Sequence, residues 1–315
     1  MRIVFFGTPE PAAQVLTTLI DAKQEIAGVV TQPDRPAGRG QRIVFSAVKE
    51  VALKAALPLE QPESVKNNNA FKAWLESVKA DLCVVVAYGK ILPKDILEIP
   101  KHGFINIHAS LLPKYRGAAP IQWALLKGEK ESGATIFKLV EQLDAGPIAA
   151  RKEVEITEDD NYETLSRKIF AAACPLLIKV LHEIKTGKVE YVPQNEAGVT
   201  LAPSFAKESG EIDWRKTAVE IHDRIRALIV WPTAHTFFRG KRLKIFRARP
   251  VPLDISTREK QPGEIIEIIK HEGLLVATGR GNLLLLELQL EGKKRMKAAD
   301  FVIGHDVKPG ETLPD

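Results

Sequence analysis

The 315-residue sequence lacks most features of a secreted, membrane-bound or disulfide-bonded protein. Its two cysteines, Cys83 and Cys174, are far apart in the chain, and such a pair forms neither a disulfide framework nor a thiolate zinc site. No run approaches the roughly 18 apolar residues of a membrane-spanning helix. Only about five apolar residues precede Gly7, fewer than the core of about 7–15 in a signal peptide. We therefore predict a protein of a reducing compartment, such as the cytoplasm.

Common cofactor, metal and nucleophile motifs are also missing. The turn Gly7-Thr8-Pro9 lacks the Gly-x-Gly-x-x-Gly fingerprint of dinucleotide binding, so no NAD is expected. The seven histidines are scattered and form no His-Glu-x-x-His pattern, so no metal site is expected. Ser110 is not part of a Gly-x-Ser-x-Gly elbow. A covalent serine mechanism is therefore poorly supported.

What remains is the composition of an ordinary globular chain with a mild basic excess. It is 45% hydrophobic and 27% charged, with a net charge of +5. The length suits about two domains of roughly 150 residues each. The positive charge permits a polyanionic partner without requiring one.

The first part of the sequence alternates between predicted strands and helices. Strands at 2–6 and 25–31 flank a helix near 10–22, which indicates a βαβ unit and a parallel sheet. Residues 81–87 are almost all apolar, as expected of a strand buried on both faces. The pattern also predicts strands at 104–108, 134–140 and 148–156 and helices near 46–56, 67–78, 120–128 and 160–187.

The second part of the sequence changes character after residue 189. Residues 190–206 are rich in turn formers and are interpreted as a linker. One helix at 217–230 and five short strands, at 234–238, 242–248, 263–270, 273–278 and 282–290, follow. We predict an α/β, Rossmann-like, mostly parallel sheet domain at 1–189. A small OB-like antiparallel β-barrel domain is predicted at 207–315.

Three polar residues at predicted strand ends are candidates for chemistry. Asn106 and His108 are two apart on a strand and should share a face. Asp144 follows another strand in a Gly/Pro-rich loop. An amide and an imidazole can stabilise an oxyanion and move protons while the acceptor itself supplies the attacking group, as in acyl or formyl transfer. Taken singly, a strand asparagine and histidine are more often structural than catalytic, and Asp144 could equally be a turn residue.

Basic residues gather in three places. The segment 32–42 is predicted to be a long irregular surface loop, either a solvated linker or a phosphate-gripping element. Clusters at 239–249 and 293–297 indicate either a nucleic-acid footprint or charges that protect sheet edges. The candidate nucleic-acid contacts in these places are Arg35, Arg39, Arg42, Arg239, Lys241, Arg242, Lys244, Lys293, Lys294 and Arg295.

Two motifs resemble a known family. Asn-Ile-His-Ala-Ser-Leu-Leu-Pro-Lys-Tyr-Arg-Gly, residues 106–117, and Leu-Asp-Ala-Gly, residues 143–146, are similar to signatures of folate-dependent formyltransferases. The resemblance extends through 32–40 and into Gly-Lys-Lys-Arg-Met near the C-terminus, and covers nearly the whole chain. Pro11 and Pro147 depart from the family pattern at two turns.

The resemblance implies a donor, an acceptor and site residues. The donor is 10-formyltetrahydrofolate, and the acceptor is the α-amino group of methionine on initiator tRNA. Asn106, His108 and Asp144 take the catalytic roles. The implied folate contacts are Ser110, Leu111, Leu112, Pro113, Tyr88, Gly89, Ile91 and Leu92, and the loop at 34–49 and the C-terminal domain hold the tRNA.

We expect a monomer that binds no metal and does not associate with a membrane. Two alternatives remain open. One is a formyltransferase for an amino-sugar nucleotide, against which the basic loop argues. The other is a non-catalytic tRNA-binding protein, against which the complete trio argues.

Overall fold

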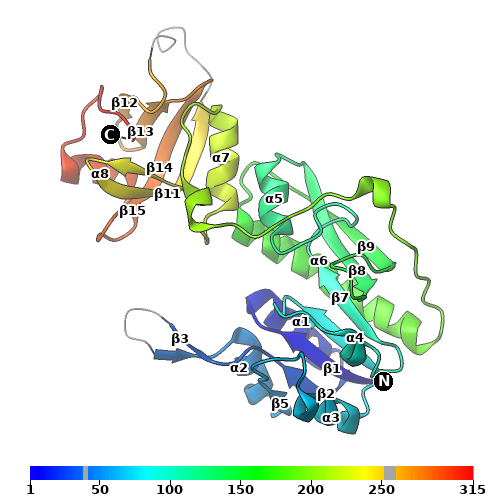
Figure 1. The fold of residues 1–315 in the computed structure, drawn as a ribbon. Coiled ribbons are helices and arrows are strands. Elements are labelled where there is room, and N and C mark those ends of the chain that lie inside the picture. The colour runs from blue at the N-terminus through cyan, green and yellow to red at the C-terminus, as the bar shows by residue number, and fades with distance from the viewer. Residues whose placement is uncertain (38–41, 252–259, 315) are drawn as a thin grey trace. The chain divides into compact units, whose positions relative to one another are not determined.

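The computed structural model describes residues 1–37, 42–251 and 260–314, and in it the chain forms two compact units (Figure 1). The predicted tRNA contact Arg39 lies outside the described residues. Unit 1 comprises residues 1–120, 131–155 and 166–202. Unit 2 comprises residues 121–130, 156–165 and 203–315. The two units are thus interleaved in sequence.

Unit 1 is built on a seven-stranded sheet of order β5-β2-β1-β6-β7-β8-β9. The strands are β1 (Arg2–Gly7), β2 (Glu25–Val30), β5 (Leu59–Glu60), β6 (Leu82–Val86), β7 (Phe104–His108), β8 (Glu131–Lys138) and β9 (Ile148–Glu155). Strands β5 to β7 in this order are parallel. The last two, β8 and β9, run antiparallel to their neighbours. The prediction of a mostly parallel sheet is confirmed.

Helices flank the strands of this sheet in sequence. They are α1 (Glu10–Asp21), α2 (Ala47–Lys54), α3 (Asn69–Val78), α4 (Lys94–Leu97), α5 (Pro120–Leu126) and α6 (Tyr162–Lys185). Side-chain caps fix two of the starts, since Ser46 accepts a hydrogen bond from the backbone of Lys49 and Asn68 from that of Phe71. Helix α4 was not predicted because a single turn is too short to show helical periodicity. No described helix is both long and apolar enough to cross a bilayer.

The prediction of an irregular loop at 32–42 holds for residues 32–34 but is wrong for residues 35–37 and 42, which lie in strands. Strands β3 (Arg35–Ala37) and β4 (Arg42–Val44) pair antiparallel as a hairpin. At the base of the hairpin, Asp34 forms an ion pair with Lys49 and accepts a hydrogen bond from Gln61 at 2.9 Å. Three-residue strands carry too little alternation to reveal themselves in sequence.

Unit 2 contains a six-stranded antiparallel sheet with β10 (His235–Phe238), β11 (Lys241–Val251), β12 (Ile265–Ile269), β13 (Gly273–Ala277), β14 (Asn282–Leu290) and β15 (Met296–Lys297). Two short helices, α7 (Ala218–Ala227) and α8 (Ala298–His305), accompany the sheet. A capping box between Thr217 and Glu220 starts α7. Five strands were predicted and are confirmed; β15 and α8 were not predicted.

Candidate active site

Strand β7 delivers Asn106 and His108 to one face of the unit 1 sheet. Asn106 pairs with Val85 on β6 and Phe137 on β8, and His108 pairs with Thr135. Because side chains two apart share a face, the amide and the imidazole point the same way. His108 is only 6% exposed. The rigid strand therefore fixes where both groups lie.

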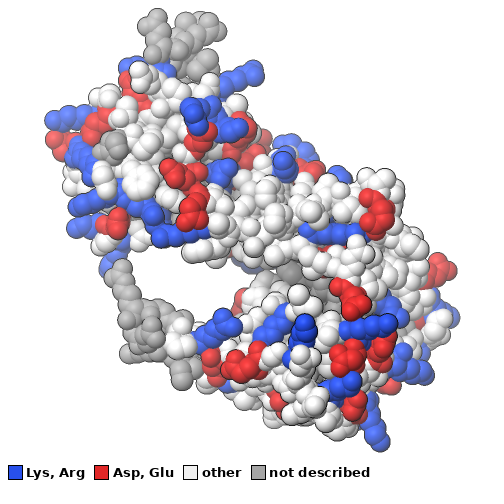
Figure 2. All heavy atoms as spheres, viewed as in Figure 1, with Lys and Arg blue, Asp and Glu red and all other residues white. Residues whose placement is uncertain are grey.

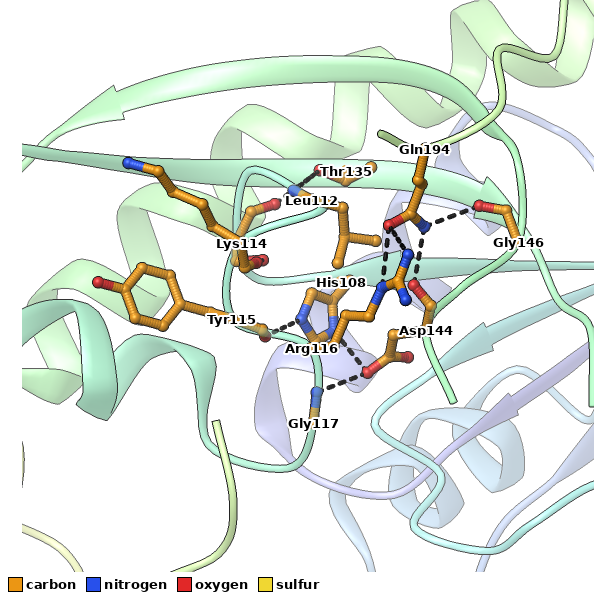
Figure 3. A network of polar contacts seen from close by, with 11 residues as sticks. His108, Leu112, Lys114, Tyr115, Arg116, Gly117, Thr135, Asp144, Gly146 and Gln194 are labelled. Atoms are coloured by element: carbon orange, nitrogen blue, oxygen red, sulfur yellow. Dashed lines mark hydrogen bonds and ion pairs between the residues drawn. The ribbon is translucent and has the colours of Figure 1, made fainter. Parts of the chain in front are cut away.

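Asp144 reaches His108 by an unexpected route. Since β8 is antiparallel to β7, its carboxyl end at Lys138 lies beside Ile105 and not beside His108. The loop 139–147 then returns to the site and places Asp144 Oδ2 3.6 Å from His108 Nδ1 (Figure 3). The same oxygen accepts a hydrogen bond from the backbone of Gly117 at 2.8 Å. The structure thus brings together two of the three predicted catalytic side chains.

The second ring nitrogen of His108 fixes the tautomer of the neutral ring. Nε2 lies 2.8 Å from the carbonyl oxygen of Tyr115. A carbonyl can only accept, so Nε2 carries a proton and donates it. In the neutral ring, Nδ1 is then the unprotonated nitrogen. Its 3.6 Å separation from Asp144 is too long for a direct hydrogen bond, so the carboxylate acts on the ring through its charge.

Asn106 presents an unused amide. The side chain is half-buried, and within residues 1–37, 42–251 and 260–314 nothing forms a hydrogen bond with it. An amide on the same face of the strand as an imidazole, with its donors uncommitted, can bind an oxygen that develops negative charge. The Asn106 amide is therefore available to bind a ligand.

Three hydrogen bonds hold the turn at 110–113, and two of them involve Thr135 on β8. Ser110 Oγ donates to the carbonyl of Lys114 at 2.6 Å, and Thr135 Oγ1 donates to the carbonyl of Ser110 at 2.6 Å. Thr135 Oγ1 in turn accepts from the backbone of Leu112 at 3.1 Å. Ser110 and Leu112 are fully buried, whereas Leu111 and Pro113 are half-buried. Of these four predicted folate contacts, the last two have the more accessible side chains.

The predicted folate contacts at 88–92 also include both buried and exposed side chains. The Tyr88 ring lies in the core, edge-on to Phe6 with ring centroids 5.4 Å apart, and Leu92 is also buried. Gly89 has φ +78°, and a Cβ there would lie 2.7 Å from Gln32 Nε2, which donates to the Tyr88 carbonyl at 2.9 Å. Ile91 is 86% exposed. A ligand would therefore meet Ile91 and the turn backbone, and not the Tyr88 ring.

Replacing Tyr88 with phenylalanine is expected to leave stability unchanged or to raise it by about 1 kcal/mol. The Tyr88 hydroxyl is buried without a hydrogen-bond partner among the described residues. Burial also raises its pKa to about 12. Urea unfolding of the wild type and of Tyr88→Phe measures the difference. A loss of 1 kcal/mol or more would mean that the hydroxyl has a partner, such as a buried water.

Sequence reasoning missed an apolar surface on the loop that carries Asp144. Leu143 and Val140 are exposed on this loop. Exposed apolar side chains beside polar groups are typical of a ligand-binding surface, but isolated leucines in a loop give no such signal in sequence. Among the described residues, no cluster of three His, Cys, Asp or Glu side chains could hold a metal ion.

The predicted tRNA contacts differ in availability. Arg239 is bound to Glu311 and to two carbonyls at the end of α8, and Arg295 makes two hydrogen bonds to Glu287. Arg35 is exposed on the hairpin, and Arg42 is in β4. The remaining five predicted contacts on unit 2 are exposed Lys241, Lys293 and Lys294 and half-buried Arg242 and Lys244. These five side chains have no ion-pair partner in the described part of the chain.

Comparison with known proteins covers both units. Residues 1–181 match the formyl transferase family, and residues 205–306 match the formyl transferase C-terminal domain. A methionyl-tRNA formyltransferase of Sulfurihydrogenibium sp. is 44% identical over 99% of both chains. One from Dictyoglomus turgidum is 47% identical over 99% of this chain and 98% of its own, and one from Bacillus subtilis is 44% identical over 99% and 97%.

Solved structures share the fold at low identity. HypX from Aquifex aeolicus in complex with tetrahydrofolic acid is 17% identical with a TM-score of 0.67, over 96% of this chain and 47% of that chain. An N-formyltransferase from Helicobacter canadensis in complex with folinic acid and dTDP-3-aminofucose is 19% identical with a TM-score of 0.65, over 90% and 98%.

Proposed function

The chain belongs to the formyl transferase family, among the methionyl-tRNA formyltransferases, and we propose that Asn106, His108 and Asp144 perform its reaction. It transfers the formyl group of 10-formyltetrahydrofolate to the α-amino group of methionyl-initiator tRNA. The observation that carries this function is the match of 42–47% identity over nearly the full length. That match includes the C-terminal unit, so it extends beyond the fold of the formyl-transferring domain.

The reaction needs an oxyanion site and a route for one proton. The amine nitrogen attacks the formyl carbon, the carbonyl oxygen becomes an oxyanion, and the bond from carbon to N10 of the folate then breaks. One proton leaves the amine and one reaches N10, so tetrahydrofolate is released neutral at that nitrogen. The free amide of Asn106 is the donor for the oxyanion, because no group of the described protein competes for it.

His108 and Asp144 provide the proton route. Nε2 is held by the Tyr115 carbonyl, which leaves Nδ1 to take the proton of the amine. The Asp144 carboxylate, 3.6 Å from Nδ1, then stabilises the imidazolium that forms. Returned to N10, the same proton completes the transfer. In this proposal Asp144 stabilises charge and the backbone carbonyl of Tyr115 orients the ring.

The donor is proposed to bind over the apolar surface next to these groups. Ile91 and Leu143 are largely exposed, at 86% and 66%, on the two loops that border the site in sequence. A flat heteroaromatic ring that covers them removes apolar area from water, which contributes roughly 25 cal/mol per Å². We include Leu111 and Pro113 of the 110–113 turn in the same surface.

The acceptor is proposed to bind one face of β10, β11 and β14. Along β11 the buried side chains Leu243 and Ile245 alternate with Arg242, Lys244 and Phe246, which are only half-buried. Figure 2 shows lysines and arginines on this unit, with acidic residues among them. Basic side chains interleaved with an aromatic ring suit a nucleic-acid backbone and an unpaired base. Arg35 and Arg42 of the unit 1 hairpin are proposed as further tRNA contacts.

Removing three basic residues of this surface is expected to flatten the salt dependence of tRNA binding. In Arg242→Ala/Lys244→Ala/Lys294→Ala, the slope of log K against log salt should fall in magnitude by roughly 2–3, at about 0.7–0.9 per lost phosphate contact. Filter binding between about 50 and 200 mM salt measures it. A control with equal charge loss at exposed unit 1 lysines, Lys66→Ala/Lys101→Ala/Lys188→Ala, should keep the wild-type slope. Equal slopes in the two triple variants would mean that this face of unit 2 does not contact the tRNA.

The choice of acceptor tests the function directly. The protein is incubated with 10-formyltetrahydrofolate and either methionyl-initiator tRNA or an amino-sugar nucleotide such as the one in the Helicobacter complex. Formyl-methionine on the tRNA is the expected product. Formylation of the sugar amine with none on tRNA would replace this function by the alternative.

A further inference from the structure

A buried arginine connects the 190–206 segment to the catalytic loop. Arg116 is 4% exposed, and a buried guanidinium requires partners for its donors. Its Nη1 and Nη2 donate to the Glu196 carboxylate at 3.3 and 2.8 Å. Its Nε and Nη2 donate to Gln194 Oε1 at 3.1 and 2.8 Å. Glu196 and Gln194 thus share a single guanidinium.

Gln194 connects Arg116 to the loop that carries Asp144. Its Oε1 is occupied by Arg116, so its Nε2 faces the loop, where it donates to the carbonyl of Asp144 at 2.7 Å and to that of Gly146 at 2.8 Å. Only this orientation of the amide satisfies all four contacts. Gln194 therefore spans the turn on both sides of Ala145.

Asp144 needs such support because its backbone is strained. Its φ is +49°, in the left-handed region that residues other than glycine seldom adopt. Such a conformation persists only where its surroundings hold it in place. Two groups do so here, the Gln194 amide on the carbonyl of Asp144 and the Gly117 backbone N–H on its carboxylate. Arg116, the residue before Gly117, orients the first of these groups.

Backbone hydrogen bonds hold the 190–202 segment in the position from which Gln194 reaches the loop. Arg116 donates its backbone N–H to Thr200 at 2.9 Å and accepts from Ala202 at 2.7 Å. Val192 and Ile148 exchange two backbone hydrogen bonds at 2.8 and 2.9 Å. A Cβ on Gly117 would lie 2.6 Å from the Ala202 carbonyl, so this close approach needs glycine. The segment is therefore an integral wall of unit 1.

We infer that Gln194, oriented by Arg116, is a positioning residue that sets the distance between the Asp144 carboxylate and His108 Nδ1. This inference rests on the proposed roles of His108 and Asp144. Gln194 contacts only the backbone of the loop, so it acts through Asp144 and touches no substrate in this account. A displacement of about 1 Å at such a site costs up to about 10²-fold in rate.

Gln194→Glu is the sharpest test, because it keeps the partner of Arg116 and loses the two donations to the loop. We expect kcat for Met-tRNA formylation to fall about 10–100-fold, with KM values for both substrates within about threefold of wild type. Gln194→Met has a side chain of similar length but removes all four contacts, and it should show the same loss in kcat. It replaces Gln194→Glu as the test if that variant folds poorly. The control Gln24→Glu makes the same chemical change at a half-buried position where, among the described residues, the amide bonds only the Ala22 carbonyl, and it should retain wild-type kcat.

A double-mutant cycle with Asp144→Asn separates positioning from general structural damage. If Gln194 acts through Asp144, the double variant should be no more than about threefold slower than Asp144→Asn alone. Losses that multiply, or a Gln194→Glu variant with wild-type kcat, would overturn the inference. Full activity of Asp144→Asn, or a wild type that does not formylate Met-tRNA, would instead contradict the proposed function, so the two failures are distinguishable.

Discussion

Asn106→Ala is expected to lower kcat for Met-tRNA formylation by about 10²–10³, the scale for losing one donor to an oxyanion. The Asn106 amide has no partner among the described side chains and backbone groups, so its loss removes an interaction made with the substrate and not one that holds the fold. Because the amide strengthens its contact only as negative charge develops, KM should change little. Steady-state kinetics with both substrates varied measures the split between kcat and KM.

Two further variants sharpen the Asn106 prediction. Asn106→Asp keeps the shape but replaces the donor with an acceptor, and it should be at least as slow as the alanine variant. Asn69→Ala, at an exposed asparagine in α3, should retain wild-type kcat. If Asn106→Ala formylated tRNA at a near-normal rate, the oxyanion site would have to lie elsewhere.

His108→Ala is the second variant for which a loss of about 10²–10³ in kcat is expected, within the range for a general acid–base residue. The imidazole carries the proton between the amine and N10 in the proposed route, so alanine breaks that route. Exogenous imidazole should restore part of the rate, because the substitution leaves a space of matching shape beside Asp144. Initial rates with and without imidazole give the measurement.

The His108 substitution also has a structural cost that needs its own control. It leaves the Tyr115 carbonyl without its hydrogen bond from Nε2, which costs about 1–3 kcal/mol for a buried group. Assays should therefore run well below the melting temperature of the variant, determined by thermal unfolding. His102→Ala, a half-buried histidine before β7, should keep wild-type activity. Normal turnover by folded His108→Ala would exclude the imidazole from the proton route.

The parts of the fold visible in sequence were those with strong patterns. Residues 82–86 are all buried, and the apolar run at 81–87 predicted this central strand. The direction of β8 was not readable, because strand orientation depends on which edge the chain returns to and not on local composition. As a result Asp144 lies beside His108 through a returning loop, although β8 ends beside Ile105.

The parts of the site that escaped prediction depend on contacts between distant residues. Gln194 and Glu196 lie in a turn-rich segment that reads as a linker, and only the fold shows that they surround Arg116. Tyr88 was expected beside the folate, but its ring packs among Phe6 and other core residues. In the same way, Arg239 and Arg295 look like free charges in sequence, whereas the fold brings Glu311 and Glu287 to them.

A single-turnover experiment on one variant tests the central claim most directly. The claim is that Asn106, His108 and Asp144 carry out the chemistry while basic surfaces elsewhere hold the tRNA. Enzyme in excess over Met-tRNA, with saturating 10-formyltetrahydrofolate, gives the rate of transfer for the wild type and for Asn106→Ala/His108→Ala/Asp144→Ala, and filter binding gives the Kd for tRNA. We predict a rate at least about 10³-fold lower for the triple variant, with its Kd within about threefold of wild type. A triple variant that still transfers the formyl group at more than about a tenth of the wild-type rate would contradict the account.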